Sequence, residues 1–573
     1  MFAQLMGEML NPTTFESFRV YSLDTIARLT EALNLIDDVR RQRVPRAVLE
    51  PIAEELEWSF NKDAAALALA EPEIKSLIRI LAAKNTFSLD DFSSHLKLIT
   101  KLVGSTYKTT LEKLILQIFD QPNQKIAIRK LAGFYCSHIL NIGYSRRFIL
   151  KTVNRFFFDS PVQRMGRASL SRFFKEFDGK TKKFIVHAFV SKDLGNYLGG
   201  LGFTIKDAED LPEAQIHTLA INDNYEKLPA ALEIAFDQFD PEGAMEHCYQ
   251  ILSAQRAISY LDPYGMHCEW GDTMHVTLHR AKSGVAITKG DFLTNKAIHS
   301  VPRSGHRART ISNYAREIIA NFDSSSTERL LSSIRTAALA RTSQSPENRL
   351  ISLWSAIEVL LSEPRDDVRI VHYTRLIVPC IALRHTRRQV IAVYDELLIP
   401  YRHRLNRLLK SMPSFPSSHG QQAFAELMFL PEHVALRTEL CQLLADNPLA
   451  LHRVWKLHND YIDIKSANRT MSDHFDRVRW QVHRVYRARN QLVHSGKMPT
   501  YLESVILNLA EYYRSSIATI VNRAKRETHS SDIDQVVAEI GIRYDILRGH
   551  FNVKAGIPFT QEHISMLMDF PTA

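Results

Sequence analysis

Arg489, Asn490 and His494 lie together in one short stretch, RARNQLVHSG (487–496), near the expected end of a helix. An arginine side chain can hold a phosphate or a developing phosphorane through two parallel hydrogen bonds. A histidine titrates near neutrality and can therefore accept or donate a proton. Together these groups suit the attack of a ribose 2′-hydroxyl on the adjacent phosphodiester without a metal ion. RNA has that hydroxyl and DNA lacks it, so the chemistry points to RNA.

The spacing of Arg489 and His494 is weak evidence when taken alone. The chain contains 23 histidines, so arginines followed by histidines at similar spacing are expected by chance. The alternative interpretation is structural, with Arg489 paired to Glu358 and His494 serving only to end a helix. Comparable pairs occur at Arg365/His372, Arg453/His458, Arg469/His474, Arg477/His483, Arg487/His494 and Arg523/His529.

The pattern upstream predicts how the helix is oriented. An apolar stripe recurs at helical spacing and comprises Val478, Val482, Val485, Tyr486 and Val493. Arg489 falls on the same stripe, and a guanidinium that faces an interior or an interface requires a partner. Gly496 is expected to end the helix as its C-cap. Residues five apart on a regular helix differ by roughly 140° of rotation, so His494 can approach Arg489 only because it lies in the fraying last turn.

The motif itself resembles a known signature. R-N-x-x-x-H near the end of a helix, followed by a long amphipathic helix, is similar to the R-x4–6-H motif of HEPN-superfamily ribonucleases, in which Asn, His or Asp commonly follows the arginine. Arg489, Asn490 and His494 match this motif.

A second stretch extends the resemblance. LWSAIEVLL (353–361) resembles the first-helix signature of HEPN domains in abortive-infection proteins, especially the Apea-like group. Glu358 matches the acidic residue often found there. The resemblance covers about residues 345–525, and an insertion around residues 395–470 separates its two parts.

The resemblance implies a helical bundle that dimerises, so that two motifs form one composite site. It implies cleavage to 2′,3′-cyclic phosphate and 5′-hydroxyl ends with no metal or cofactor, in a toxin or antiphage effector. We therefore expect Arg489 and His494 to be catalytic. Asn490 is expected to orient the histidine or the phosphate, or simply to face solvent. Glu358 is expected to hold Arg489 in an ion pair rather than to transfer protons. The expected RNA contacts are Arg477, Arg484, Arg487 and Lys497.

The totals fit a cytoplasmic protein of several domains. The chain has 573 residues, a net charge of +9 and five cysteines, a number that argues against a disulfide framework. Neither a signal peptide nor a membrane span is expected. The cluster from His267 to His279 lacks metal-ligand spacing, so no metal site is expected. Expected partners are RNA, a second copy of the chain or a higher homo-oligomer, and a phage-derived or other trigger.

The elements that must position the motif are mainly helical. The middle segment is predicted to be α+β, with a strand at 183–190, strand-like LGGLGFTI (198–205), a helix at 242–260 and a β pair joined at 282–284. The predicted divisions are an N-terminal helical domain (1–142), a basic stretch with an α+β domain (143–300), a connection (301–344), a HEPN-like helical domain (345–527) and a tail that packs back (528–573).

One basic stretch leaves two interpretations open. Residues 145–183 hold eleven Lys or Arg, three acids and seven Phe. This composition fits RNA binding through phosphates and stacked bases, or a helix pair with phenylalanines in its core. For the whole chain, an RNA endonuclease is the leading hypothesis. The alternatives are a non-catalytic interaction protein and a ligand sensor that uses the middle domain.

Overall fold

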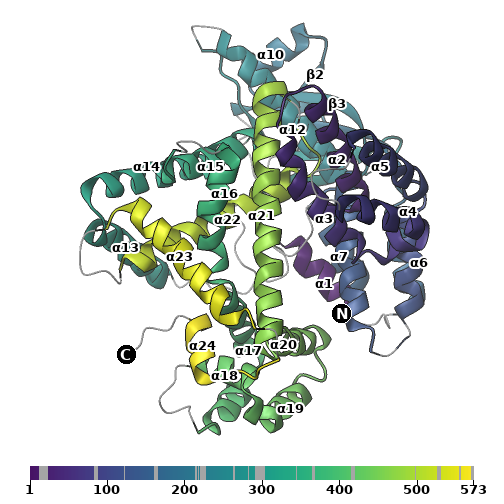
Figure 1. Cartoon of the computed structure of the whole chain (residues 1–573). Helices are drawn as coiled ribbons and strands as arrows, with labels where there is room; N and C mark the ends of the chain where they lie inside the picture. The colour runs from purple at the N-terminus through teal and green to yellow at the C-terminus, as the bar shows by residue number, and fades with distance from the viewer. Residues whose placement is uncertain are drawn as a thin grey trace.

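A computed structural model of the chain is mainly helical, with one five-stranded sheet between two helical regions (Figure 1). This confirms the predicted fold class. The structure describes the chain except for residues 12–22, 83–87, 120, 122, 160–165, 213–215, 217, 218, 220–226, 262–264, 282, 291–303, 344, 364–367, 414–419, 497, 526–530, 554, 555 and 569–573.

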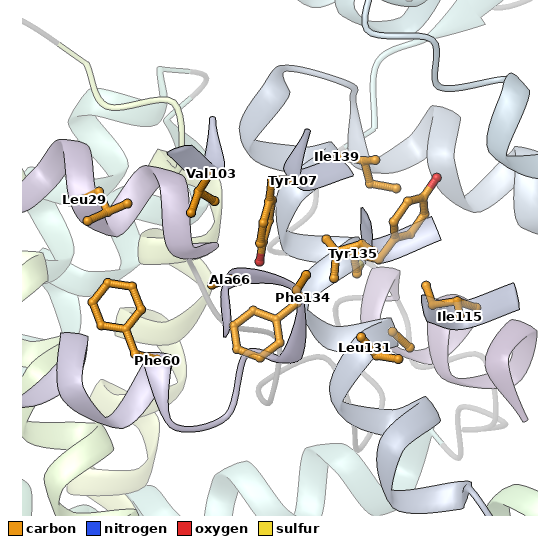
Figure 2. Close-up of a cluster of buried hydrophobic side chains, with 14 of the residues drawn as sticks. Leu29, Phe60, Ala66, Val103, Tyr107, Ile115, Leu131, Phe134, Tyr135 and Ile139 are labelled. Carbon is orange, nitrogen blue, oxygen red and sulfur yellow. The ribbon is translucent and has the colours of Figure 1, made fainter. Parts of the chain in front are cut away.

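The N-terminal helices share one hydrophobic core, which continues past residue 142. Figure 2 shows part of it, where Phe60, Phe134 and Tyr135 are buried among aliphatic side chains. The hydroxyl of buried Tyr107 donates a hydrogen bond to Asp63, 2.6 Å away, so this polar group is satisfied inside the core. The helices are α1 (Phe2–Leu10), α2 (Thr25–Arg40), α3 (Glu50–Phe60), α4 (Ala64–Ala82), α5 (Leu89–Val103), α6 (Tyr107–Phe119), α7 (Lys125–Ile142), α8 (Arg146–Phe157) and α9 (Arg167–Lys175).

Helices α8 and α9 account for most of the basic, Phe-rich stretch. Phe157, Phe173 and Phe174 are buried in the N-terminal core, whereas Phe158 is 51% exposed. Rings packed inside a core cannot stack on bases, so the core interpretation holds for these three phenylalanines.

The sheet forms the centre of the middle region. Its order is β2-β3-β1-β4-β5, and every neighbouring pair is antiparallel. The predicted first strand, the helix and the β pair are all present. The strand-like run 198–205 is a correction, because Leu198–Gly200 end helix α10, residues 201–203 turn, and only Thr204 and Ile205 enter a strand. The elements are β1 (Lys182–Val190), α10 (Lys192–Gly200), β2 (Thr204–Asp207), β3 (Ala230–Gln238), α12 (Pro241–Ile258), β4 (Trp270–Leu278) and β5 (Val285–Thr288).

The C-terminal region contains two hydrophobic cores among the described residues. The first, here called the bundle core, includes side chains of helices α13 and α14, which lie in the stretch expected to be a connection. The tail also packs back as expected, because α23 joins this core. Its helices are α13 (Ser304–Asn321), α14 (Ser324–Thr342), α15 (Pro346–Leu360), α16 (Arg369–Ala382), α22 (Leu502–Ala524) and α23 (Ile533–Phe551).

The expected insertion around residues 395–470 builds most of the second core, here called the insertion core. The sequence PSFPSSHG (413–420) has the composition of a loop, and most of it lies outside the described residues. The helices of the insertion core are α17 (His385–Lys410), α18 (Gly420–Phe429), α19 (Val434–Leu443), α20 (Pro448–Asp460) and α24 (Gln561–Met568).

One long helix, α21 (Ile464–Ser495), connects the cores and carries the motif. Asp463 caps its first turn by accepting a hydrogen bond from the Ser466 N–H. Its 32 residues correspond to a length of about 48 Å. Ile464 packs in the insertion core and Val485 in the bundle core. Figure 1 shows α21 as a central column, with α2 and α3 on one side and α15, α16 and α22 on the other.

Candidate functional site

Arg489 lies near the C-terminal end of α21, where α15 passes beside it. Its Nη2 atom is 3.6 Å from the Glu358 Oε2 atom, and the two side chains are 25% and 24% exposed. This distance is that of an ion pair and is too long for a hydrogen bond. The expected pairing of Arg489 with Glu358 is confirmed. The arginine is anchored on one side and remains open to solvent on the other.

Glu358 is itself held by the indole of Trp354. The Trp354 Nε1–H donates a hydrogen bond to the Glu358 Oε1 atom at 2.7 Å. Trp354 is buried, and its ring contacts Tyr486 of α21. One carboxylate oxygen therefore takes the indole hydrogen bond while the other faces Arg489. The sequence carried a signal for this arrangement, because residues four apart on a helix lie on the same face.

Asn490 makes its hydrogen bond to the neighbouring arginine. Its Oδ1 atom accepts from Arg489 Nη1 at 3.0 Å. The expected roles of Asn490, to orient the histidine or the phosphate or simply to face solvent, stay predictions. In the structure the asparagine helps to set the guanidinium plane, together with Glu358.

His494 is exposed in the last turn of α21. Gly496 ends the helix with a φ of 63°, and its N–H donates to the Leu492 carbonyl at 2.9 Å. This left-handed conformation favours glycine, so the predicted C-cap is confirmed. Within the described part of the chain, no hydrogen bond joins the His494 ring to Arg489.

The apolar stripe differs from the prediction near its end. Val493 was expected to continue it, but this side chain is 49% exposed. Ala488 and Leu492 are buried in the bundle core instead. On a helix with 3.6 residues per turn, a residue fifteen positions after Val478 does not return to the same face. Val493 therefore lies outside the buried face.

Arg484 does not fit the predicted phosphate contact, because its side chain is 0% exposed. It lies between two glutamates of the N-terminal helices, 2.8 Å from Glu31 and 2.5 Å from Glu55. Arg28 forms a further ion pair with Glu55 at 3.0 Å. We call this set, completed by Arg487, the interdomain charge network.

The other predicted RNA contacts have different surroundings. Arg487 is 17% exposed and pairs with Glu31 at 2.9 Å, so it is largely committed to the same network. Half-buried Arg477 donates to the Asp473 carbonyl of its own helix at 2.9 Å. Lys497 lies outside the described residues. Of the four, only Arg477 is placed without an acidic partner from the N-terminal helices.

The charge network has a clear electrostatic signature. Burial alone would raise the pKa of Glu31, but Arg484 and Arg487 lower it to about 2. The pKa of Glu55 is also lowered, because Arg484 and Arg28 outweigh its burial. Both glutamates are therefore ionised at neutral pH and hold the arginine of α21 between them. No sequence signal links Arg484 to residues more than 400 positions away.

Two general features of the described residues complete the picture of the site. No group of three or more His, Cys, Asp or Glu side chains among them is arranged to hold a metal ion. No helix in the described ranges is long and apolar enough to cross a membrane.

Comparisons with protein families, with curated proteins and with solved structures found no match to this chain. A functional assignment therefore depends on the geometry of Arg489, His494 and their surroundings.

Proposed function

We propose that the chain is an RNA endonuclease whose catalytic groups are Arg489 and His494, contributed by two copies of the chain. The observation that supports this most directly is the state of Arg489. Glu358 and Asn490 fix its guanidinium in place while a quarter of the side chain stays exposed. A fixed cation that faces solvent is suited to binding a phosphate.

His494 would provide the proton transfers. In the first step the imidazole removes the proton of the 2′-hydroxyl as the 2′-oxygen attacks phosphorus. The bond from phosphorus to the 5′-oxygen breaks, and an imidazolium donates a proton to that leaving oxygen. The products are a 2′,3′-cyclic phosphate and a 5′-hydroxyl, and no external water or oxidant is consumed. Removing such a general base costs about 100- to 10,000-fold in rate.

A second copy of the chain would supply the missing half of the site. Arg489 and His494 lie five residues apart on the continuous helix α21, so their side chains leave the helix in directions that differ by roughly 140°. One imidazole is also poorly placed to act on both sides of the phosphorus. Val493 and Met498, which flank His494, are 49% and 43% exposed. Apolar side chains around a polar group favour a protein–protein contact there. Two such ends facing each other would place two arginines and two histidines around one phosphate.

The biological role proposed is that of a toxin or antiphage effector activated by a phage-derived or other trigger. The competing functions are a non-catalytic protein that binds RNA or a partner, and a ligand sensor. They differ from the nuclease in one respect: neither requires a free imidazole at position 494.

The test is cleavage of a labelled single-stranded RNA by the purified full chain in EDTA. We expect cleavage to fall by at least about 100-fold in Arg489→Ala and His494→Ala. Arg402→Ala and His403→Ala are matched controls, because both residues are exposed on α17. A substrate with a single 2′-deoxy sugar at the cleaved position should resist cleavage, and the product should carry a cyclic phosphate.

Complementation tests the composite site. Mixing Arg489→Ala with His494→Ala protein should raise cleavage above that of either variant alone, because a mixed dimer regains one arginine and one histidine. The rate should stay below that of the wild type, because the single imidazole serves only one side of the phosphorus. Undiminished cleavage in both single variants, with unchanged unfolding midpoints, would overturn the proposal.

A further inference from the structure

A pocket of about 320 Å³ opens in the middle region, between helix α12 and strand β4. Its volume lies within the range of small-molecule sites. Helix α12, which forms one wall of the pocket, is labelled near the upper end of α21 in Figure 1. The lining residues are Lys227, Leu228, Tyr249, Arg256, Glu269, Trp270 and Asp272.

Aromatic rings and cations alternate around this pocket. The rings of Tyr249 and Trp270 meet edge to face, with centroids 5.3 Å apart. The Arg256 guanidinium lies 4.5 Å from the centre of the Trp270 ring. The Lys289 Nζ atom lies 2.9 Å from the centre of the Tyr249 ring. Cations held against aromatic faces can turn towards an anion, while the rings offer flat stacking surfaces.

The remaining lining groups add both signs of charge. Lys227 is exposed at the pocket, as are the carboxylates of Glu269 and Asp272. Glu269 also lies 3.3 Å from the His267 Nε2 atom in an exposed ion pair. A ligand that contacts the cations, the carboxylates and the rings together carries an anion, hydrogen-bond donors and a flat ring. An apolar molecule would make no polar contact with these groups, and a simple anion would face the two carboxylates.

We propose that this pocket binds a nucleoside phosphate. The phosphate would contact Lys227 and Arg256, and the base would lie against Trp270. The exocyclic amino group of adenine or cytosine would donate to Glu269 or Asp272, the pairing that carboxylates make with amino-bearing bases. Such a ligand could be a free nucleotide or the phosphorylated end of an RNA strand.

Nucleotide binding at this pocket does not depend on the proposed function.

The experiment is titration calorimetry on the full chain carrying Arg489→Ala, so that binding is measured without cleavage. The probes are AMP, CMP, UMP, adenosine, inorganic phosphate and a 5′-phosphorylated RNA tetranucleotide. We expect AMP and CMP to bind at least about fivefold more tightly than UMP, because uracil lacks the amino group. Adenosine and phosphate alone should each bind more weakly than AMP.

Variants locate the binding to the pocket. Lys227→Ala, Arg256→Ala and Trp270→Ala should each weaken binding by about tenfold, since one lost contact of 1.4 kcal/mol corresponds to that factor. Lys192→Ala is the matched control, because Lys192 is exposed on α10 and does not line the pocket. Binding of the tetranucleotide alone, lost in the same variants, would support the site and identify its ligand as an RNA end. Failure of every nucleotide to bind, or binding unchanged in all three variants, would overturn the proposal. Either result would leave the cleavage experiment unaffected.

Discussion

Replacing Arg484 with methionine is the most informative perturbation of the interdomain charge network. The variant keeps an unbranched side chain of similar length but removes the charge between Glu31 and Glu55. Glu55 would retain Arg28 and Glu31 would retain Arg487. Two buried carboxylates would then share less positive charge than they need to remain ionised.

The size of the effect can be worked out in two ways. Breaking a buried ion pair by removing one partner typically costs about 3 to 5 kcal/mol. The pKa of Glu31, lowered from an ordinary value of 4.5 to about 2, corresponds to about 3 kcal/mol of stabilisation. The side chains of Arg484 and Glu31 are 0% and 8% exposed, so solvent screens them little. We expect the free energy of unfolding to fall by about 3 kcal/mol at pH 7.

The pH dependence follows from the direction of the Glu31 shift. A carboxyl group whose pKa is lowered by folding stabilises the fold above its ordinary pKa. That contribution is lost as the pH falls from 4.5 towards 2. The difference between wild type and Arg484→Met should therefore shrink by roughly 1 kcal/mol between pH 7 and pH 4.

The assay is equilibrium unfolding in urea, followed by tryptophan fluorescence. Trp58 and Trp480 meet across the same interface with ring centroids 5.7 Å apart, so the signal reports on it directly. Glu31→Gln and the double variant complete a cycle that isolates the coupling between the two side chains. Arg402→Met, on the exposed face of α17, is the control and should change stability by less than about 0.5 kcal/mol. If Arg484→Met proves as stable as this control, with no coupling in the cycle, the buried network does not hold the N-terminal helices to α21.

Three further predictions concern other parts of the molecule. Glu358→Gln should slow RNA cleavage by about tenfold while lowering the free energy of unfolding by less than about 1 kcal/mol. The measurements are single-turnover cleavage and unfolding in urea. Cleavage at the wild-type rate would exclude a positioning role for Glu358. Burial and two neighbouring arginines lower the pKa of His483 to about 3, so the folded chain favours the neutral imidazole. The fold therefore loses about 1.4 kcal/mol of stability per pH unit as the pH falls from roughly 6.5 towards 3. His483→Gln should therefore flatten the pH profile of the unfolding midpoint over this window, and an equally steep profile would contradict the argument. A Cβ at position 284 would meet the side chain of His275 and, at 2.7 Å, the Val276 carbonyl oxygen, so Gly284→Ala should lower the free energy of unfolding by about 1 to 3 kcal/mol. Gly541→Ala in α23, where a Cβ has no neighbour within 4 Å, should raise it by about 0.5 to 1 kcal/mol. Equal unfolding midpoints for the two variants would refute the steric reasoning.

Local signals in the sequence predicted the features that depend on local chemistry. The cap at Gly496 follows from the conformational freedom of glycine. The strand at 183–190 and the β pair around residue 283 follow from alternation and turn residues. The Arg489–Glu358 pair could be expected because a charge on an apolar stripe requires a partner. Each of these inferences uses residues whose spacing fixes their geometry.

The remaining features depend on contacts between distant segments. Arg484 lies on α21, which has other helices packed on two of its sides. The apolar stripe in the sequence indicates only one of these sides, so it does not predict the surroundings of Arg484. Its partners, Glu31 and Glu55, belong to helices more than 400 residues earlier in the chain. Residues 304–342 are polar enough to suggest a connection, yet Leu330 and Ala340 bury themselves in the bundle core. Tertiary packing decides such cases, and composition does not.

The length of α21 determines how the protein can be divided. A chain shortened to begin near residue 345 would retain Arg489 and His494 but would lose the surroundings of Trp480 and Arg484. Water would reach a guanidinium that is now fully enclosed, and the indole would lose the Glu54 carboxylate, 2.9 Å from its nitrogen. We therefore expect that the region from residue 345 onward does not fold stably by itself, and that transplanting it into another protein would require the first helices of the chain to be carried along with it.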